Sequence, residues 1–221
     1  MNLYHGSKIS NLKPVENGSG VFNDYGSGFY LSLNKDAAGS WACKHDELGF
    51  IYKYFISNRY FQRLKILDLT NKEKYSVLNW IAILVHFKKI DESFLKENEE
   101  ALKWLEKYFI DVSNYDVVIG FRADDSYFDF PKAFISNNLA FEDLEYVYKL
   151  GDLGVQFFFR SKRAINLLKE VECTHCDNKY LGTHVKVVND ATREYKKLIH
   201  EPKVSSKTYI FDIIRKENGN N

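Results

Sequence analysis

Three side chains with ligand-binding chemistry stand out by type and spacing. His5 opens a His-Gly-Ser sequence after a short apolar run, Tyr30 follows the glycine-flanked 26–28 segment, and Trp41 comes eleven residues later. A single histidine after a strand is more often structural than catalytic. Two aromatic residues in a chain rich in Tyr and Phe are more often part of the core. Their joint spacing therefore carries more information than any one of them.

The ordered set resembles the nicotinamide pocket of the diphtheria-toxin and poly(ADP-ribose) polymerase class of ADP-ribosyltransferases. That class has His-Gly-Ser, then a glycine-flanked Gly-x-Tyr-Phe, then a second aromatic residue eleven positions further on. Here these motifs correspond to His5-Gly6-Ser7, to Gly28-Phe29-Tyr30-Leu31 and to Trp41. The resemblance implies that NAD is the substrate.

Each matched residue has an expected role in that chemistry. Cleavage of the nicotinamide–ribose bond passes through an oxocarbenium-like state, so the leaving ring and the ribose must be held rigidly. Tyr30 and Trp41 are expected to hold the nicotinamide between their rings. His5 is expected to bond a ribose hydroxyl, and the Gly6 backbone the carboxamide. The remaining residues of the two motifs expected to bind NAD are Ser7 and Gly28.

Two positions depart from the class. The serine that supports the carboxamide there corresponds to Ala38 here, with Ser40 as a nearby substitute. The catalytic glutamate on a later strand corresponds to Gln156, which can bond a ribose hydroxyl but can neither take a proton nor supply charge. We therefore expect His5, Tyr30 and Gln156 to be the catalytic set of a mono-transferase.

More of the chain is similar to the bacterial domain-of-unknown-function family 3990, over about residues 3–170. The segments that carry this resemblance are Tyr-His-Gly-Ser, Asp24-Tyr25-Gly26-Ser27-Gly28-Phe29-Tyr30-Leu31-Ser32, Val77-Leu78-Asn79-Trp80-Ile81-Ala82, Tyr115-Asp116-Val117-Val118-Ile119-Gly120 with Ala123-Asp124-Asp125, and Gln156-Phe157-Phe158-Phe159. Glutamine is the usual residue of that family's third motif, although its Gly-Pro-Val-Ala is Gly120-Phe121-Arg122-Ala123 here. The resemblance implies a toxin of a toxin–antitoxin locus.

The loop after residue 121 offers further candidate ligand-binding groups. Asp124 and Asp125 could orient the ribose or deprotonate an acceptor, which would supply the charge that Gln156 lacks. They could equally be acidic residues at a helix N-terminus. Arg122 could meet a pyrophosphate or pair with these aspartates.

The chain also contains a C-x-x-C sequence, Cys173-Thr-His-Cys176. Zinc would need further ligands from His175, His184 or His200, and no second such motif exists. Two unpaired cysteines are the favoured interpretation, and no metal is expected. With only 3 cysteines and no apolar run long enough to span a bilayer, the sequence indicates a cytoplasmic protein without a membrane partner.

The resemblance implies an α+β fold: the split, twisted antiparallel double sheet of ADP-ribosyltransferases. Apolar runs predict strands at residues 1–4, 29–31, 50–56, 63–68, 115–121 and 154–159. Helical spacing predicts helices at 34–44, 71–88, 91–109, 141–149, 162–169 and 189–200. We expect residues 1–170 to form the transferase domain with 71–109 as a helical insert, and residues 171–221 to be an extension packed on it.

Three functions from different classes remain open at this point. The first is mono-ADP-ribosylation of a macromolecular acceptor, protein or nucleic acid, with a cognate antitoxin covering the pocket or the acceptor surface. The second is a catalytically silent module that binds NAD or ADP-ribose, which Gln156 and Ala38 would suit. The third is an interaction protein whose aromatic residues are only core. The near balance of 31 basic and 30 acidic residues predicts no strong nucleic-acid or membrane field.

Overall fold

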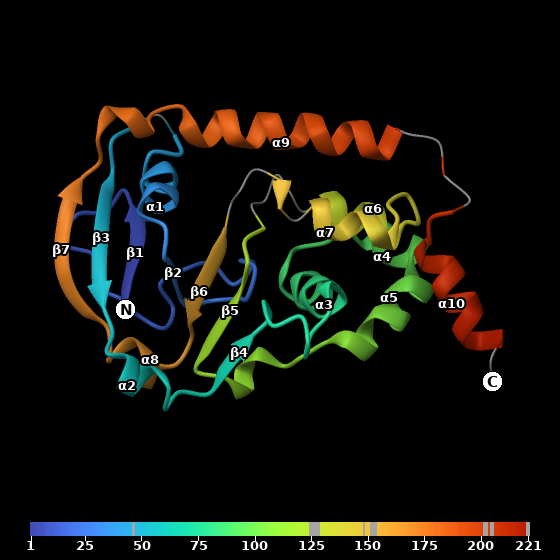
Figure 1. Cartoon of the computed structure of the whole chain (residues 1–221), viewed down its shortest axis with the longest axis horizontal. Coiled ribbons are helices and arrows are strands. Elements are labelled where there is room, and N and C mark those ends of the chain that lie inside the picture. The colour runs from blue at the N-terminus through green and yellow to red at the C-terminus, as the bar shows by residue number, and fades with distance from the viewer. Residues whose placement is uncertain are drawn as a thin grey trace.

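The protein has an α+β fold in which seven strands form one sheet and most helices lie beyond its β4 edge (Figure 1). The computed structural model describes residues 1–45, 47–123, 129–147, 149–150, 154–200, 203 and 206–219. The strand order is β4-β5-β6-β2-β1-β3-β7. The strands are β1 Asn2–Ser7, β2 Phe29–Ser32, β3 Phe50–Phe55, β4 Ile66–Asp68, β5 Val117–Phe121, β6 Val155–Phe159 and β7 Lys169–His175.

The described helices fall into a small group beside the sheet and a larger group between and after β4 and β5. They are α1 Lys35–Ala42, α2 Asn58–Phe61, α3 Val77–Phe87, α4 Glu92–Glu97, α5 Glu99–Leu105, α6 Asp129–Ile135, α7 Leu144–Val147, α8 Lys162–Ile165, α9 Thr183–His200 and α10 Ile210–Gly219, with short 3-10 turns at Glu106–Tyr108, Val112–Asn114, Phe141–Asp143 and Asn178–Tyr180. No helix in this part of the chain is long and apolar enough to cross a membrane.

The sheet has its weakest strand pairing between β1 and β2. These strands share a single pair, Tyr4 with Ser32, whereas β1 pairs with β3 along its whole length and β2 with β6 likewise. The expected double sheet is therefore one hydrogen-bonded sheet that opens at this junction. It is also not wholly antiparallel, because β4 and β5 are parallel. The helices α3 to α5 form the crossover that such a parallel pair requires.

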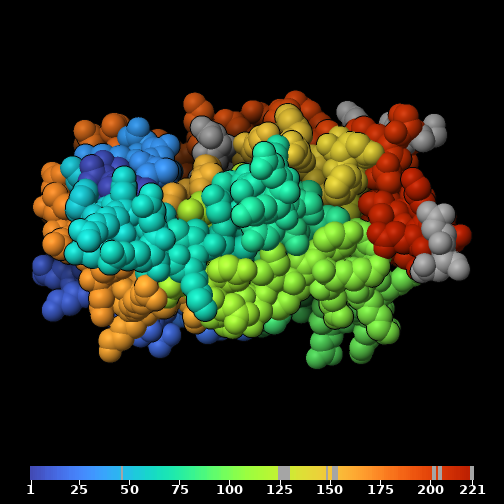
Figure 2. Space-filling view, turned by 60° about the horizontal axis from the view of Figure 1, so that its bottom comes forward, coloured from blue at the N-terminus to red at the C-terminus, as the bar shows by residue number. Residues whose placement is uncertain are grey.

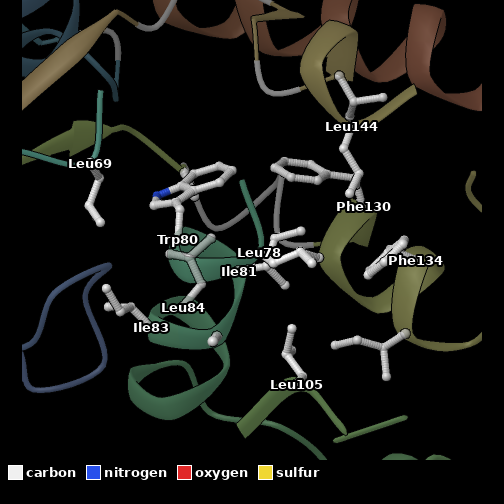
Figure 3. Packing of buried hydrophobic residues seen from close by; sticks show 14 of the residues in the cluster. Leu69, Leu78, Trp80, Ile81, Ile83, Leu84, Leu105, Phe130, Phe134 and Leu144 are labelled. Atoms are coloured by element: carbon white, nitrogen blue, oxygen red, sulfur yellow. The ribbon is translucent and has the colours of Figure 1, made fainter. Parts of the chain in front are cut away.

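The helical segment between β4 and β5 buries the larger hydrophobic cluster. Helix α3 begins at Val77, where Ser76 and Asn79 form a capping box, and not at Asn71. Its apolar face packs against α5 and α6, with Trp80 and Phe130 stacked at 5.7 Å (Figure 3). The predicted helices at 71–88 and 91–109 are thus confirmed in place, but the second is divided into α4, α5 and a 3-10 turn.

The C-terminal region contributes to the sheet as well as to the helices. Instead of a helix over 162–169, α8 ends at Ile165 and β7 pairs with β3 along the sheet edge. The expected domain boundary at residue 170 therefore falls inside a strand. Beyond it, α9 starts earlier than the expected 189 and runs past both the sheet and the helices (Figure 1). Helix α10 closes the far end of the molecule against the helical region (Figure 2).

Candidate functional site

A cavity of about 510 Å³ lies at the junction where β1 and β2 separate. Its volume is in the range of small-molecule sites. The sequence-predicted residues that line it are His5, Gly6, Ser7, Tyr30, Trp41, Arg122 and Gln156. Strands β1, β2 and β6 thus each bring one of the expected catalytic side chains to the same cavity.

His5 is held as a neutral ring with a defined tautomer. Its Nδ1 lies 2.7 Å from the carbonyl oxygen of Tyr30, and the ring stacks on Phe29 at 4.5 Å. Because a carbonyl can only accept, Nδ1 must carry the proton. Burial lowers the His5 pKa to about 4, against the opposing effect of the Tyr30 hydrogen bond and with a further lowering from Arg122. At neutral pH the unprotonated Nε2 is therefore a hydrogen-bond acceptor.

The backbone of Gly6 faces the opening between β1 and β2. Met1 exchanges both of its backbone hydrogen bonds with Ile56 on the β3 side. Since bonding alternates along an antiparallel strand, the N–H and C=O of Gly6 point away from β3. A Cβ at Gly6 would lie 1.9 Å from the carbonyl oxygen of Ala38 on α1. Glycine here allows α1 to pack closely on β1.

Tyr30 is held by two hydrogen bonds to its hydroxyl and by packing against its ring. Its hydroxyl donates to the Gly26 carbonyl at 2.7 Å and accepts from the Tyr25 amide at 3.0 Å. Phe158 packs against the ring with centroids 4.8 Å apart. Burial raises the pKa of the Tyr30 hydroxyl well above its ordinary value, so it remains a donor. The residue can therefore present an immobile aromatic surface to the cavity.

Trp41 carries two cations on its ring. The Arg122 guanidinium lies 4.2 Å from the ring centroid and Lys44 Nζ 4.3 Å, while the His184 ring meets Trp41 edge-on. Both contacts are of the cation–π type. The structure records no ring contact between Trp41 and Tyr30 among the described residues. A flat ligand ring held between them would take the place of one of these cations.

Gln156 is buried at the inner end of the cavity and its amide is oriented. Its Nε2 lies 2.7 Å from Asp24 Oδ2 and 3.2 Å from the Phe121 carbonyl. Both partners are acceptors, so the nitrogen must be on this side and Oε1 on the other. Tyr25 Oη and Trp80 Nε1 donate to the same Phe121 carbonyl. The Trp80 motif on α3 is thereby connected to the site.

Asp24 and Lys88 form a buried ion pair that also lines the cavity. Lys88 Nζ is 2.9 Å from Asp24 Oδ1, and both side chains are only 7% exposed. The amide of Ala123 donates to Asp24 Oδ2 at 2.8 Å. Burial raises the pKa of Asp24, and the nearby Lys88 opposes that rise. Because every hydrogen-bonding partner of this carboxyl is a donor, the carboxylate form fits the network.

The other predicted binding residues are less central. Gly28 does not line the cavity, and a Cβ there would lie 2.3 Å from the Phe158 ring, so its glycine is explained by packing. Ser7 lines the cavity but its hydroxyl accepts from the Ile9 amide. Ser40 is not among the lining residues, whereas Ala38 is. Asp124 and Asp125 lie outside the described residues.

The cysteines of the C-x-x-C sequence point to different surroundings. Cys173 is exposed on β7, whereas Cys176 is buried in a small cluster with Cys43, and all three are free thiols. Burial and the neighbouring Cys43 raise the pKa of Cys176 to about 12. Within the described part of the chain, no group of three or more His, Cys, Asp or Glu side chains could hold a metal ion.

Three charged residues line the cavity although the sequence analysis did not predict them: Asp24, Lys88 and Lys44. Asp24 stands at the first position of the Asp-x-Gly motif that precedes Tyr30, and this was a signal that it belongs to the site. Lys88 follows an apolar helix and is itself followed by Lys89, a pattern typical of a solvated helix end. Lys44 likewise had no distinguishing pattern.

Comparison with known proteins gives one match. The model of a protein family described as "Protein of unknown function (DUF3990)" matches residues 1–169. No curated protein and no solved structure matches the sequence.

Proposed function

The chain belongs to the DUF3990 family, and we propose that it is a NAD-dependent mono-ADP-ribosyltransferase. The observation that carries the proposal is the convergence of His5, Tyr30 and Gln156 from three strands on one cavity at the β1–β2 opening. Two further features support it: the Gly6 backbone groups point into the opening between β1 and β2, and Trp41 carries two cations. A carboxamide needs a paired donor and acceptor, and a pyrophosphate needs positive charge.

In the proposed reaction, the bond between C1′ of the ribose and the nicotinamide nitrogen breaks, and its electron pair leaves with nicotinamide. Gly6 would clamp the carboxamide while His5 Nε2 and Gln156 Oε1 accept hydrogen bonds from ribose hydroxyls. An acceptor nucleophile then forms a bond to C1′ and releases its proton to solvent water. The rate enhancement would come from positioning and preorganised dipoles.

The charge at the inner end of the cavity restricts what the site can do. Gln156 cannot remove a proton from an acceptor. Among the described residues, the one carboxylate that lines the cavity is Asp24, which is already paired with Lys88. Described side chains that include no free carboxylate suit a nucleophile that needs little activation, and a single transfer. We therefore propose a macromolecular acceptor, modified once, and a toxin role in which a cognate antitoxin covers the cavity.

The test is nicotinamide release from NAD by the full chain, with and without bacterial lysate, followed by mass spectrometry for a bound ADP-ribose. His5→Ala and Gln156→Ala should each lower the release at least about tenfold, because each removes a contact made to the reacting ribose. Matched controls are His175→Ala and Gln62→Ala, since neither residue lines the cavity and both are exposed. These two should release nicotinamide at the wild-type rate.

Two other results would replace the proposal. A rise in melting temperature with millimolar NAD but no release of nicotinamide would make the protein a silent binding module. Two lining residues favour this second function: Gln156, which cannot take a proton, and Ala38, which cannot bond a carboxamide with its side chain. If NAD causes neither nicotinamide release nor a rise in melting temperature, the remaining function is that of an interaction protein.

A further inference from the structure

Asp24 differs from the other cavity residues because it is buried, charged and hydrogen-bonded to Gln156 on β6. Its carboxylate receives hydrogen bonds from Lys88, from the Ala123 amide and from Gln156. It lies in the loop before β2, whereas Gln156 is on β6. The loop and the strand are therefore joined directly at the inner end of the cavity.

The orientation of the Gln156 amide follows from this contact. If the amide were turned over, Oε1 would face the Asp24 carboxylate and the Phe121 carbonyl, which are both acceptors. The turned amide would lose both of these hydrogen bonds and would place three buried acceptors against one another. The turned amide is therefore excluded, and Oε1 stays on the side away from Asp24.

Oε1 is accessible from the cavity. Among the described residues, Gln156 Oε1 makes no hydrogen bond, since both bonds of the amide are made by Nε2. It is also not fully buried, because Tyr54 Oη is the one fully buried side-chain polar atom without a partner in the described part of the chain. Gln156 lines the cavity, so its oxygen is left available to a ligand. Together with His5 Nε2, this places two side-chain hydrogen-bond acceptors in the cavity.

We propose that Asp24 is a positioning residue that holds the Gln156 amide so that only its oxygen meets the ligand. This rests on the proposed function and deepens it. The site would then select a ligand that presents two hydrogen-bond donors, such as the neighbouring hydroxyls of an unmodified ribose. A ribose without its 2′-hydroxyl would leave a buried acceptor unpaired and should be rejected.

The first measurement needs no ligand. In the amide spectrum of the full chain, the Gln156 side-chain resonance is identified by its loss in Gln156→Ala. Asp24→Asn should shift this resonance and speed its hydrogen exchange at least about tenfold, because a charge-assisted bond is removed.

If Asp24→Asn fails to fold, Gln156→Glu provides the same test, since it places a second carboxylate against Asp24. It should lower the folding equilibrium constant at least about tenfold, whereas the exposed control Gln62→Glu should change it less than about twofold.

The second measurement compares turnover of NAD with that of its analogue lacking the 2′-hydroxyl on the nicotinamide ribose. The wild type should prefer NAD at least about tenfold in kcat/KM, and Asp24→Asn should reduce this preference to within about twofold. A residue needed only for folding would lower both rates equally.

The outcomes separate the two proposals. An unchanged Gln156 resonance in Asp24→Asn, a Gln156→Glu variant as stable as the wild type, or an unchanged substrate preference would each overturn the role of Asp24. Absence of wild-type turnover would overturn the transferase proposal alone, because the spectrum and the stability measurement still decide how the amide is held.

Discussion

His5 links the pH dependence of stability to the site. Its pKa is lowered by burial from the ordinary 6.5 to about 4 in the folded chain. Between these values the unfolded chain binds the proton and the folded chain does not, so stability falls as the pH falls. The contribution is complete above pH 6.5, is lost progressively below it, and reaches its limit near pH 4.

We expect this histidine to account for about 2 to 3 kcal/mol of the stability lost between pH 7 and pH 4.5. Urea unfolding at both pH values gives the fall in the free energy of unfolding for the wild type and for His5→Asn. The difference between these two falls is the contribution of His5. Carboxyl groups contribute equally to both proteins and cancel. Parallel losses in the two proteins would show that the ring titrates normally when folded.

Gly6→Ala tests the close approach of α1 to β1. The added Cβ would lie 1.9 Å from the Ala38 carbonyl oxygen and 2.9 Å from the Ala42 amide nitrogen, both of them backbone atoms. Because neither can move without displacing the helix, we expect a loss of at least about 2 kcal/mol in urea unfolding. Gly20→Ala is the control, because it also lines the cavity and a Cβ there meets nothing within 4 Å. A Gly6→Ala chain as stable as Gly20→Ala would contradict the packing argument.

At the scale of the element, α1 is the helix that carries Trp41 to the cavity, and Asn34 begins it. The Asn34 side chain accepts hydrogen bonds from the amides of Asp36 and Ala37. Asn34→Ala should lower the free energy of unfolding by about 1 kcal/mol, and Asn34→Asp should retain it because the acceptor remains. Thermal and urea unfolding of both variants measure this. A loss in the aspartate variant as large as in the alanine variant would show that the cap is not what matters.

The elements that the sequence predicted well are those whose own residues determine them. Strands β5 and β6 are determined by their own apolar residues, and α1 by its N-terminal cap. Strand β7 was missed because its residues are nearly all exposed and it exists through pairing with β3. The ion pair of Asp24 and Lys88 could not be predicted either, since only the fold brings the loop and the end of α3 together.

At the scale of the whole molecule, the two larger buried clusters take alternate residues of β5 and β6, so they lie on opposite faces of these strands. One is formed largely by the helices and includes Trp80, Ile210 and Ile214, and the other packs around β1, β2 and β3. The family match ends at residue 169, yet β7 completes the sheet edge and α10 completes the helical cluster. The residues after the match are thus part of the same folded unit.

Ile214→Ala tests whether α10 stabilises the helical part without shaping the cavity. Ile214 is 3% exposed, and Glu217 on the same helix accepts a hydrogen bond from Trp104 Nε1 at 2.9 Å. Removing the buried side chain should cost about 2 to 4 kcal/mol in urea unfolding, whereas the exposed Lys216→Ala should stay within about 0.5 kcal/mol. Because no residue of α10 lines the cavity, the NAD-induced rise in melting temperature should be the same in both variants and the wild type. A smaller rise in Ile214→Ala than in Lys216→Ala would mean that α10 and the cavity are energetically coupled, and that the C-terminal helix belongs to the binding machinery.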